Sequence, residues 1–152
     1  MSRPPGPRVL SEEDLSALLG AQHFSILATN RRSGHPHLTT MVHSWDPESR
    51  VVRFFTTADR VKVKHLRRDP RAAVHVPGED VWSFAVGEGE AEVSEITTTP
   101  GDAVGREVLS ILPEPMRPAD ERAFLEQLVE ERRVVIRLKV NRLYGTALDV
   151  DG

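Results

Sequence analysis

The sequence predicts a mainly β protein of the α+β class, built as a small antiparallel barrel of six to seven strands with peripheral helices. Short segments rich in Val, Ile, Phe and Thr recur along the chain and are separated by turn residues. The expected helices lie between groups of strands instead of alternating with them, which disfavours a doubly wound sheet. The length of 152 residues suits one domain with its own core.

The N-terminal half is predicted to hold one helix and three strands. Residues 1–10 are proline-rich and read as a disordered or surface-lying arm, so the domain is expected over residues 11–149. Ser11 begins a helix with acidic residues in its first turn, and Gly20 is expected to end it. Strands are predicted at 23–30, 37–45 and 50–57, joined by a hairpin loop at 31–34 and a turn at 46–49.

The C-terminal half is predicted to hold four strands and two helices. Strands are expected at 71–76 and 81–93, and Gly87 and Gly89 mark a bulge or bend in the second of them. Helical spacing covers 100–112 and, after a proline-rich connector, 119–132. The second helix carries an apolar stripe of Phe124, Leu125, Leu128 and Val129. Two closing strands are predicted at 133–140 and 143–149.

The composition excludes several classes of function. The net charge is −3, so general binding to nucleic acid or to a membrane surface is not expected. The chain has no cysteine, which excludes disulfides, thiolate catalysis and zinc–thiolate sites. No apolar run approaches the roughly 20 residues of a membrane span, and the start MSRPPGPR lacks the apolar core of a signal peptide. A cytoplasmic protein is expected.

The segment 56–70, TTADRVKVKHLRRDP, has the features of an anion site. Thr56 and Thr57 end a strand, Asp59 is the expected N-cap of a helix, and the first turn carries the cations Arg60, Lys62 and Lys64. Cations at a helix N-terminus cost a few tenths of a kcal/mol each, and a bound phosphate would offset that cost. The alternative is a solvated basic face of a surface helix that turns Val63 and Leu66 inward.

The strand 37–45 has two faces of different character. One face carries His37, Thr39, Met41, His43 and Trp45, and the other carries Leu38, Thr40, Val42 and Ser44. Leu38 and Val42 are expected to point into the barrel, so that the mixed face could pack against a planar heterocycle. An ordinary half-exposed strand explains the same pattern.

Motifs for self-sufficient catalysis are missing from the sequence. His35, His37 and His43 do not come with the carboxylate or thiolate spacing of a metal site, so no metal is expected. No G-x-S-x-G, Walker or G-x-G-x-x-G motif is found. Redox chemistry would therefore depend on a bound cofactor. Trp82 and Phe84 are expected on one strand face, either as core or interface residues or as a cofactor wall.

The order of these features resembles the flavin/deazaflavin oxidoreductases of the split β-barrel superfamily. These are the pyridoxamine 5'-phosphate-oxidase-like proteins, and the likeness is to their F420-dependent reductase branch (type B). It runs from about residue 11 to residue 148. Its motifs are RVKVKHLRRDPRA at 60–72, WSFAV at 82–86, the EGEA at 88–91, RVVI at 133–136 and YG at 144–145.

The resemblance implies a homodimer with two cofactor sites at the subunit interface. In such proteins the residues that match Arg60 and Lys62 hold the cofactor phosphate, with help from a hydroxyl at the position of Thr56 or Thr57 and with Lys64 nearby. The strand that matches Thr39, Thr40, Met41, Val42 and His43 lies against the ring system. Trp82 of the second subunit would help to close the pocket.

The function implied is hydride transfer from reduced coenzyme F420 to an electron-poor small molecule such as an enone, a quinone or a tetrapyrrole-like acceptor. A proton would come from solvent or from a group such as His43. Val61 stands where flavin mononucleotide (FMN) members often have arginine, and the chain lacks their Arg-Leu-Ala-Pro-like tail, which favours F420. The alternatives are an FMN-dependent oxidoreductase on the same barrel and a non-catalytic carrier of the coenzyme or of haem.

Overall fold

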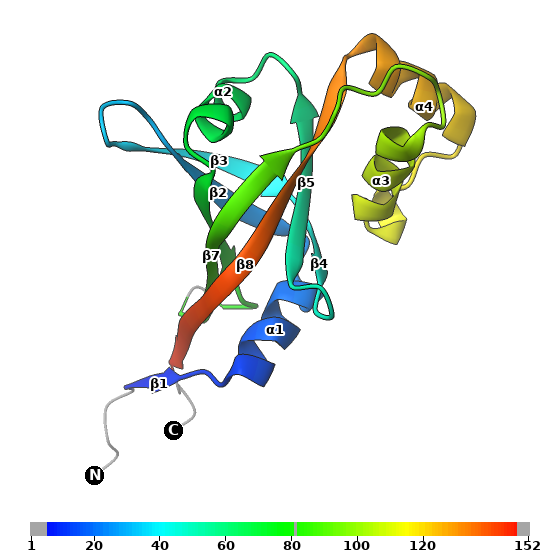
Figure 1. Cartoon of the computed structure of the whole chain (residues 1–152). Coiled ribbons are helices and arrows are strands. Elements are labelled where there is room, and N and C mark those ends of the chain that lie inside the picture. The colour runs from blue at the N-terminus through cyan, green and yellow to red at the C-terminus, as the bar shows by residue number, and fades with distance from the viewer. Residues whose placement is uncertain (1–5, 81, 149–152) are drawn as a thin grey trace.

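A curled antiparallel sheet forms a half-barrel in the computed structural model, which describes residues 6–80 and 82–148 (Figure 1). The sheet has the order β3-β2-β6-β7-β8-β5-β4, and β1 pairs with β8. Its strands are β1 Pro7–Val9, β2 Phe24–Asn30, β3 Pro36–Val42, β4 Ser44–Asp46, β5 Val51–Thr57, β6 Arg71–Pro77, β7 Phe84–Val93 and β8 Arg133–Leu148. The predicted antiparallel barrel with peripheral helices is confirmed.

The long strand β8 lies between β7 and β5 and so links the two parts of the curled sheet. It pairs with β7 along most of its length and with β5 through its first half. The predicted break into two closing strands is wrong, because Asn141 is accommodated as a bulge between Val140 and Arg142, opposite the step from Glu88 to Gly89. A Cβ atom on Gly89 would lie 1.8 Å from the carbonyl oxygen of Lys139, which explains the predicted glycine at this bulge.

The helices lie outside the sheet, as predicted. They are α1 Glu12–Ala21, α2 Val61–Arg68, α3 Ala103–Ile111 and α4 Glu121–Glu130, with a 3-10 turn η1 at Glu114–Met116. The Ser11 hydroxyl caps α1 by accepting a hydrogen bond from the Asp14 N–H at 3.1 Å. Helix α1 continues through Gly20 to Ala21 and packs Leu15 and Leu19 into the main core. No helix in the described part of the chain is long and apolar enough to cross a membrane.

Helices α3 and α4 form a separate layer beside β5 and β8 (Figure 1). The predicted stripe of α4 is confirmed, since Leu125 and Leu128 are buried with Val108 and Ile111 of α3. The Glu107 carboxylate accepts hydrogen bonds from Arg53 of β5 at 2.9 Å and from Arg137 of β8 at 2.6 and 2.7 Å. Apolar packing and this ion pair together hold α3 against the sheet.

The strand predicted at 37–45 has its faces reversed relative to the expectation. Leu38 is 61 % exposed, whereas Met41 and His43 are buried. The strand also breaks at His43, between β3 and β4. The reason is that helices cover the mixed face: the Leu19 carbonyl of α1 accepts a hydrogen bond from His43 Nε2 at 3.0 Å. Leu38 and Val42 therefore lie on the side of the sheet away from the main core, where Leu38 is exposed and Val42 packs against the α3–α4 cluster.

Some predicted boundaries fall on residues that the structure does not describe. These are residues 1–5 of the arm, Val81 at the predicted start of the strand 81–93, and Asp149 at the end of the last predicted strand. Within the described part of the arm, Pro7–Val9 pairs with 146–148 of β8 as an exposed short strand.

Candidate functional site

The N-terminus of α2 lies where β5 ends, and no side chain caps it. The helix starts at Val61, with Arg60 as N-cap residue and no side-chain cap hydrogen bond. The expected cap, Asp59, instead accepts a hydrogen bond from the Thr57 hydroxyl at 2.8 Å, which lowers the pKa of its carboxyl. The Asp59 cap was thus a wrong prediction, because the Thr57 hydroxyl holds the carboxylate and the helix begins later. The first turn of α2 keeps its positive end.

Lys62 is a buried cation without an anionic partner among the described residues. It is 6 % exposed, and no carboxylate is among the groups that act on its ammonium. Burial, followed by the charge of Arg60, lowers the pKa of Lys62. Arg60 and Lys64 are both exposed, since residues two apart on a helix point in different directions. Of the three predicted cations, only Lys62 faces the interior, which distinguishes this helix from a solvated basic face.

Strand β3 lies across from Lys62 and supplies two further polar groups. His37 and Thr39 are on the same face of β3 as the buried Met41. The pKa of His37 is lowered by burial, then by Arg31 and Lys62, which means that the ammonium of Lys62 acts on this imidazole. His37 Nδ1 and Thr39 Oγ1 are both buried without a hydrogen-bond partner in the described structure.

A second histidine of α2 completes this cluster. The rings of His37 and His65 meet edge to face with their centroids 5.3 Å apart, and His65 Nδ1 lies 3.0 Å from the Thr29 hydroxyl of β2. His65 follows Lys62 by three residues and therefore shares its side of α2. Burial is the main cause that lowers the pKa of His65. We call Lys62, His37, Thr39 and His65 the α2–β3 cluster.

The α2–β3 cluster has the chemistry that an anion requires. Lys62 can only donate hydrogen bonds, and the Thr39 hydroxyl and the His37 imidazole are able to donate them. An unpaired ammonium on a largely buried side chain and two buried polar atoms without partners cost free energy that one phosphate group would offset. The residues present therefore fit a phosphate-bearing cofactor.

The structure separates the other predicted site residues into distinct places. Thr56 is buried at the end of β5 and Thr57 binds Asp59. Met41 belongs to the main core, and Thr40 and Val42 lie on the opposite side of β3 from the cluster. The sequence analysis placed His37 on the strand face that could pack against a planar cofactor ring, and it considered and rejected His37 as a metal ligand. It did not single out His65. The spacing of His65 from Lys62 on one helix was the available signal.

His43 is a core residue in this structure. It is fully buried, its ring lies 6.5 Å from that of Phe54, and its Nε2 donates to the Leu19 carbonyl. Burial lowers the pKa of His43 and keeps the imidazole neutral. This placement argues against the suggested role as proton donor to a bound acceptor.

Trp82 lies at the other end of β7 from the site. It is in the turn before β7, not in a strand as predicted, and it is 59 % exposed. Thr57 pairs with the first residue of β8, and that end of β8 pairs with the last residues of β7. Within one chain, Trp82 and Thr57 are thus separated by the length of β7.

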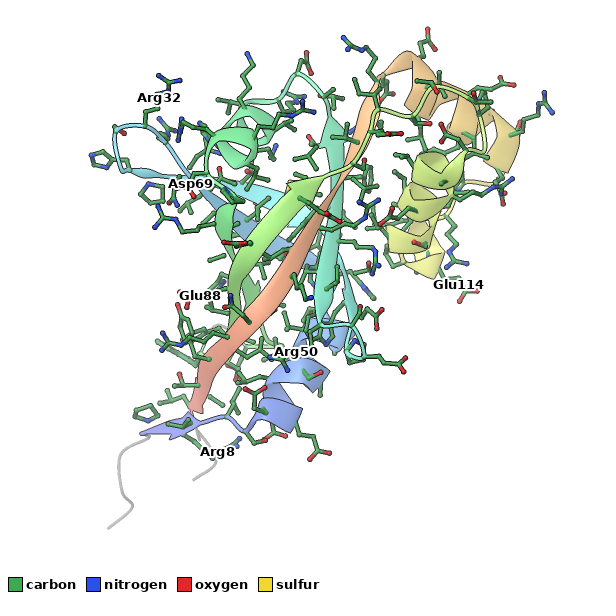
Figure 2. All side chains as sticks on the ribbon, viewed as in Figure 1. Arg8, Arg32, Arg50, Asp69, Glu88 and Glu114 are labelled. Atoms are coloured by element: carbon green, nitrogen blue, oxygen red, sulfur yellow. The ribbon has the colours of Figure 1, made fainter. Side chains whose placement is uncertain are left out.

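An arginine-lined cavity of about 550 Å³ adjoins the C-terminal end of α2. Its walls are Asn30, Arg31, Arg32, Gly34, Arg68, Asp69 and Arg71. Figure 2 shows Arg32 on the β2–β3 hairpin and Asp69 just after α2. Asp69 pairs with Arg71 at 2.9 Å, whereas Arg31 and Arg32 have no carboxylate partner in the described part of the chain. The cavity therefore carries unpaired positive charge.

Metal binding has no visible basis in the same region. In residues 6–80 and 82–148, no group of three or more His, Asp or Glu side chains is arranged to hold a metal ion. The histidines of the α2–β3 cluster face cations, which opposes metal binding at this place.

Comparison with known proteins gives consistent matches over nearly the whole chain. F420H(2)-dependent biliverdin reductase of Mycobacterium tuberculosis is 24% identical over 135 residues, which cover 89% of this chain and 88% of that protein. Among solved structures, the conserved hypothetical protein Rv2991 of Mycobacterium tuberculosis has 26% identity and a TM-score of 0.67, with 90% of this chain and 84% of that one covered. A structure named F420 reductase has 26% identity and a TM-score of 0.60, with 84% and 94% covered.

A family match covers the same region as the fold and the site. The family described as pyridoxamine 5'-phosphate oxidase matches residues 11–147, a range that includes every strand from β2 to β7, all four helices and the α2–β3 cluster. The curled antiparallel sheet found here is the architecture that the sequence resemblance implied. The chain therefore belongs to the pyridoxamine 5'-phosphate oxidase family of split β-barrel proteins.

Proposed function

We propose that this protein is an F420-dependent oxidoreductase that binds the coenzyme phosphate at the α2–β3 cluster. The observation that carries the proposal is Lys62, a buried cation with no anionic partner in the described chain, at the uncapped start of a helix. Two relatives support the choice of coenzyme, since one is named F420H(2)-dependent biliverdin reductase and the other F420 reductase.

The protein's own contribution is binding, orientation and exclusion of water. Lys62 would hold the phosphate with charge-assisted hydrogen bonds, with Thr39 and the first N–H groups of α2 as further donors and with Arg60 and Thr56 close by. The reduced coenzyme supplies a hydride to an electron-poor small-molecule acceptor. Because His43 is sealed in the core, the proton that accompanies reduction would come from solvent.

The arginine-lined cavity favours F420 over FMN. F420 carries an acidic tail beyond its phosphate, and FMN does not. Arg31 and Arg32 present unpaired cations in a cavity next to α2, which suits an extended acidic group. FMN remains the second candidate, because the same phosphate site would serve a flavin in this family.

An apolar surface on the outside of the sheet supports the proposed homodimer. Phe24, Ile26, Leu38 and Tyr144 are 56, 37, 61 and 40 % exposed. They lie on one face, since the strand register aligns Ile26 with His75, Val86 and Tyr144 across four neighbouring strands. Four exposed apolar side chains on one face of the sheet suit contact with a second copy of the chain.

The dimer is tested by placing a charge on this surface. Leu38→Glu should shift the protein from dimer to monomer in light scattering coupled to gel filtration. Met116→Glu is the matched control, because Met116 is 43 % exposed on η1, outside the apolar sheet face. A dimer that survives Leu38→Glu unchanged would refute this choice of interface.

The cofactor is tested by titrating cofactor-free protein with F420 and with FMN, followed by fluorescence and calorimetry. Selective micromolar or tighter binding of F420 is expected, and turnover with enone, quinone or tetrapyrrole acceptors would then distinguish a reductase from a carrier. Preference for FMN would favour the flavin-dependent alternative. If neither compound binds, the proposal is wrong.

A further inference from the structure

We propose that His37 is a further ligand of the anion at Lys62, and that its imidazole takes up a proton when the anion binds. The inference rests on the proposed function, in which the anion is the phosphate of the cofactor. It assigns a binding role to a residue of β3 that lies outside the basic segment of α2.

The position of His37 is fixed by three elements. On β3 it pairs with Thr29 of β2, and the Thr29 hydroxyl contacts His65 Nδ1 at 3.0 Å. His65 of α2 in turn meets the His37 ring edge to face. This chain of contacts holds the imidazole beside Lys62 while leaving the buried Nδ1 of His37 without a partner. Packing thus orients the ring but does not satisfy this nitrogen.

The charged groups around His37 favour an anion as its missing partner. The charged groups that act on the ring are Arg31 from the β2–β3 loop and Lys62 from α2, and both are cations. His65, the other titratable group in contact, is itself under the influence of Arg68 and Arg31. A carbonyl or carboxylate at this nitrogen would have indicated a structural histidine. Instead, His37 Nδ1 is buried without a partner within the influence of Lys62, and Thr39 Oγ1 is a second buried, unpartnered group on the same face of β3.

The charge of the bound anion reverses the electrostatic balance at the ring. In the free protein, burial and then Arg31 and Lys62 lower the pKa of His37, so the ring is neutral near pH 7. A phosphate oxygen at Nδ1 places a negative charge closer than either cation and raises that pKa. Binding then takes up protons, and the affinity falls as the pH rises from about 6.5 to about 8.5.

The test measures proton uptake as well as affinity. F420, or FMN if the flavin is the ligand that binds, is titrated calorimetrically into wild-type protein in two buffers with different enthalpies of ionisation. The comparison is repeated with His37→Gln, which keeps a polar side chain but cannot be protonated. His35→Gln is the control, because His35 is an exposed residue of the same hairpin. Ionisation of the ligand itself is common to all three proteins and cancels in their ratio.

The wild type and His35→Gln are expected to take up a larger fraction of a proton per cofactor bound near pH 7.5 than His37→Gln does. The affinity ratio of wild type to His37→Gln should fall several-fold between about pH 6.5 and about pH 8.5. If His37→Gln does not fold, the side-chain ¹⁵N shifts of His37 in the wild type serve instead, and they should move toward those of an imidazolium in the complex.

Two other outcomes would overturn the inference, and they differ from each other. Tight cofactor binding with equal proton uptake in the wild type and His37→Gln, or ¹⁵N shifts that stay those of a neutral ring, would leave the phosphate site in place and make His37 a packing residue. Absence of binding by the wild type to either cofactor would refute the proposed function and this inference together.

Discussion

Replacing Lys62 with methionine should weaken cofactor binding and stabilise the cofactor-free protein at the same time. Methionine has a similar length and no charge, so the change removes the ammonium group while keeping the buried stem. Lys62 is 6 % exposed, with no carboxylate partner in the described residues, so the free protein carries the cost of a desolvated charge. In the complex, the same substitution removes the charge-assisted hydrogen bond from Lys62 to the phosphate, so cofactor affinity should fall.

The magnitude of the binding loss follows from the type of contact. A hydrogen bond to a charged group contributes about 1.5–3 kcal/mol, which corresponds to a dissociation constant about 10- to 160-fold higher. The gain in stability is expected to be about 1 kcal/mol, which raises the melting temperature by about 2–4 °C for a chain of this size.

The sign of the stability change is supported by the direction of the pKa shift. Burial lowers the pKa of Lys62 below that of the unfolded chain, so the unfolded state holds the proton more tightly. The wild type therefore gains stability only as the pH rises toward the unfolded pKa of about 10.4, and at neutral pH the cost is fully present. Lys62→Met should lose this alkaline gain.

The assay pairs thermal unfolding of cofactor-free protein with calorimetric titration of F420. Lys64→Met is the matched control, since it removes the same charge from an exposed position of the same helix and should change stability by less than about 0.5 kcal/mol. If Lys62→Met destabilises the free protein and leaves the affinity unchanged, Lys62 serves the fold and the phosphate lies elsewhere.

Three further predictions concern the fold. Glu107→Gln should lower the free energy of unfolding by about 2 kcal/mol in chemical denaturation, because Arg53 and Arg137 lose their common carboxylate. An unchanged denaturation midpoint would show that apolar packing alone holds α3. Gly89→Ala should lower the free energy of unfolding by about 3 kcal/mol, because the new Cβ would clash with the Lys139 carbonyl. Gly20→Ala should stabilise α1 by about 0.5–1 kcal/mol, because a Cβ has space there. Similar melting temperatures for the two variants would contradict the bulge geometry. Burial lowers the pKa of His43, so the folded state binds its proton less tightly than the unfolded chain, and stability should fall as the pH drops below about 6.5. His43→Gln should therefore lose less stability than the wild type between about pH 7.5 and about pH 5.5. Equal losses would show that His43 does not cause this pH dependence.

Local patterns predicted most of the secondary structure. The Ser11 cap, the apolar stripe of α4 and the glycine at the β7 bulge depend on residues within a few positions of one another, and all three are found as predicted. The two closing strands were wrong because Asn141 reads locally as a break, whereas the long pairing of β8 with β7 carries the chain through it.

The candidate site shows the limit of such patterns. The sequence by itself determined that a basic helix follows the strand ending at Thr57, and that only a bound cofactor could supply redox chemistry. It did not determine which segments cover Lys62, although helix periodicity places Lys62 one turn before the inward Leu66 and Lys64 on a different side.

Tertiary packing determined which segments cover Lys62 and also assembled the rest of the cluster. Strand β3 faces α2 because it pairs with β2, so His37 comes within the influence of Lys62 from about 25 residues away in the chain. The same packing turned Leu38 outward, opposite to the expectation from its apolar side chain. Helix and strand periods are set by neighbours in sequence, whereas burial is set by whatever covers a face, and at this site the covering segments are distant in the chain.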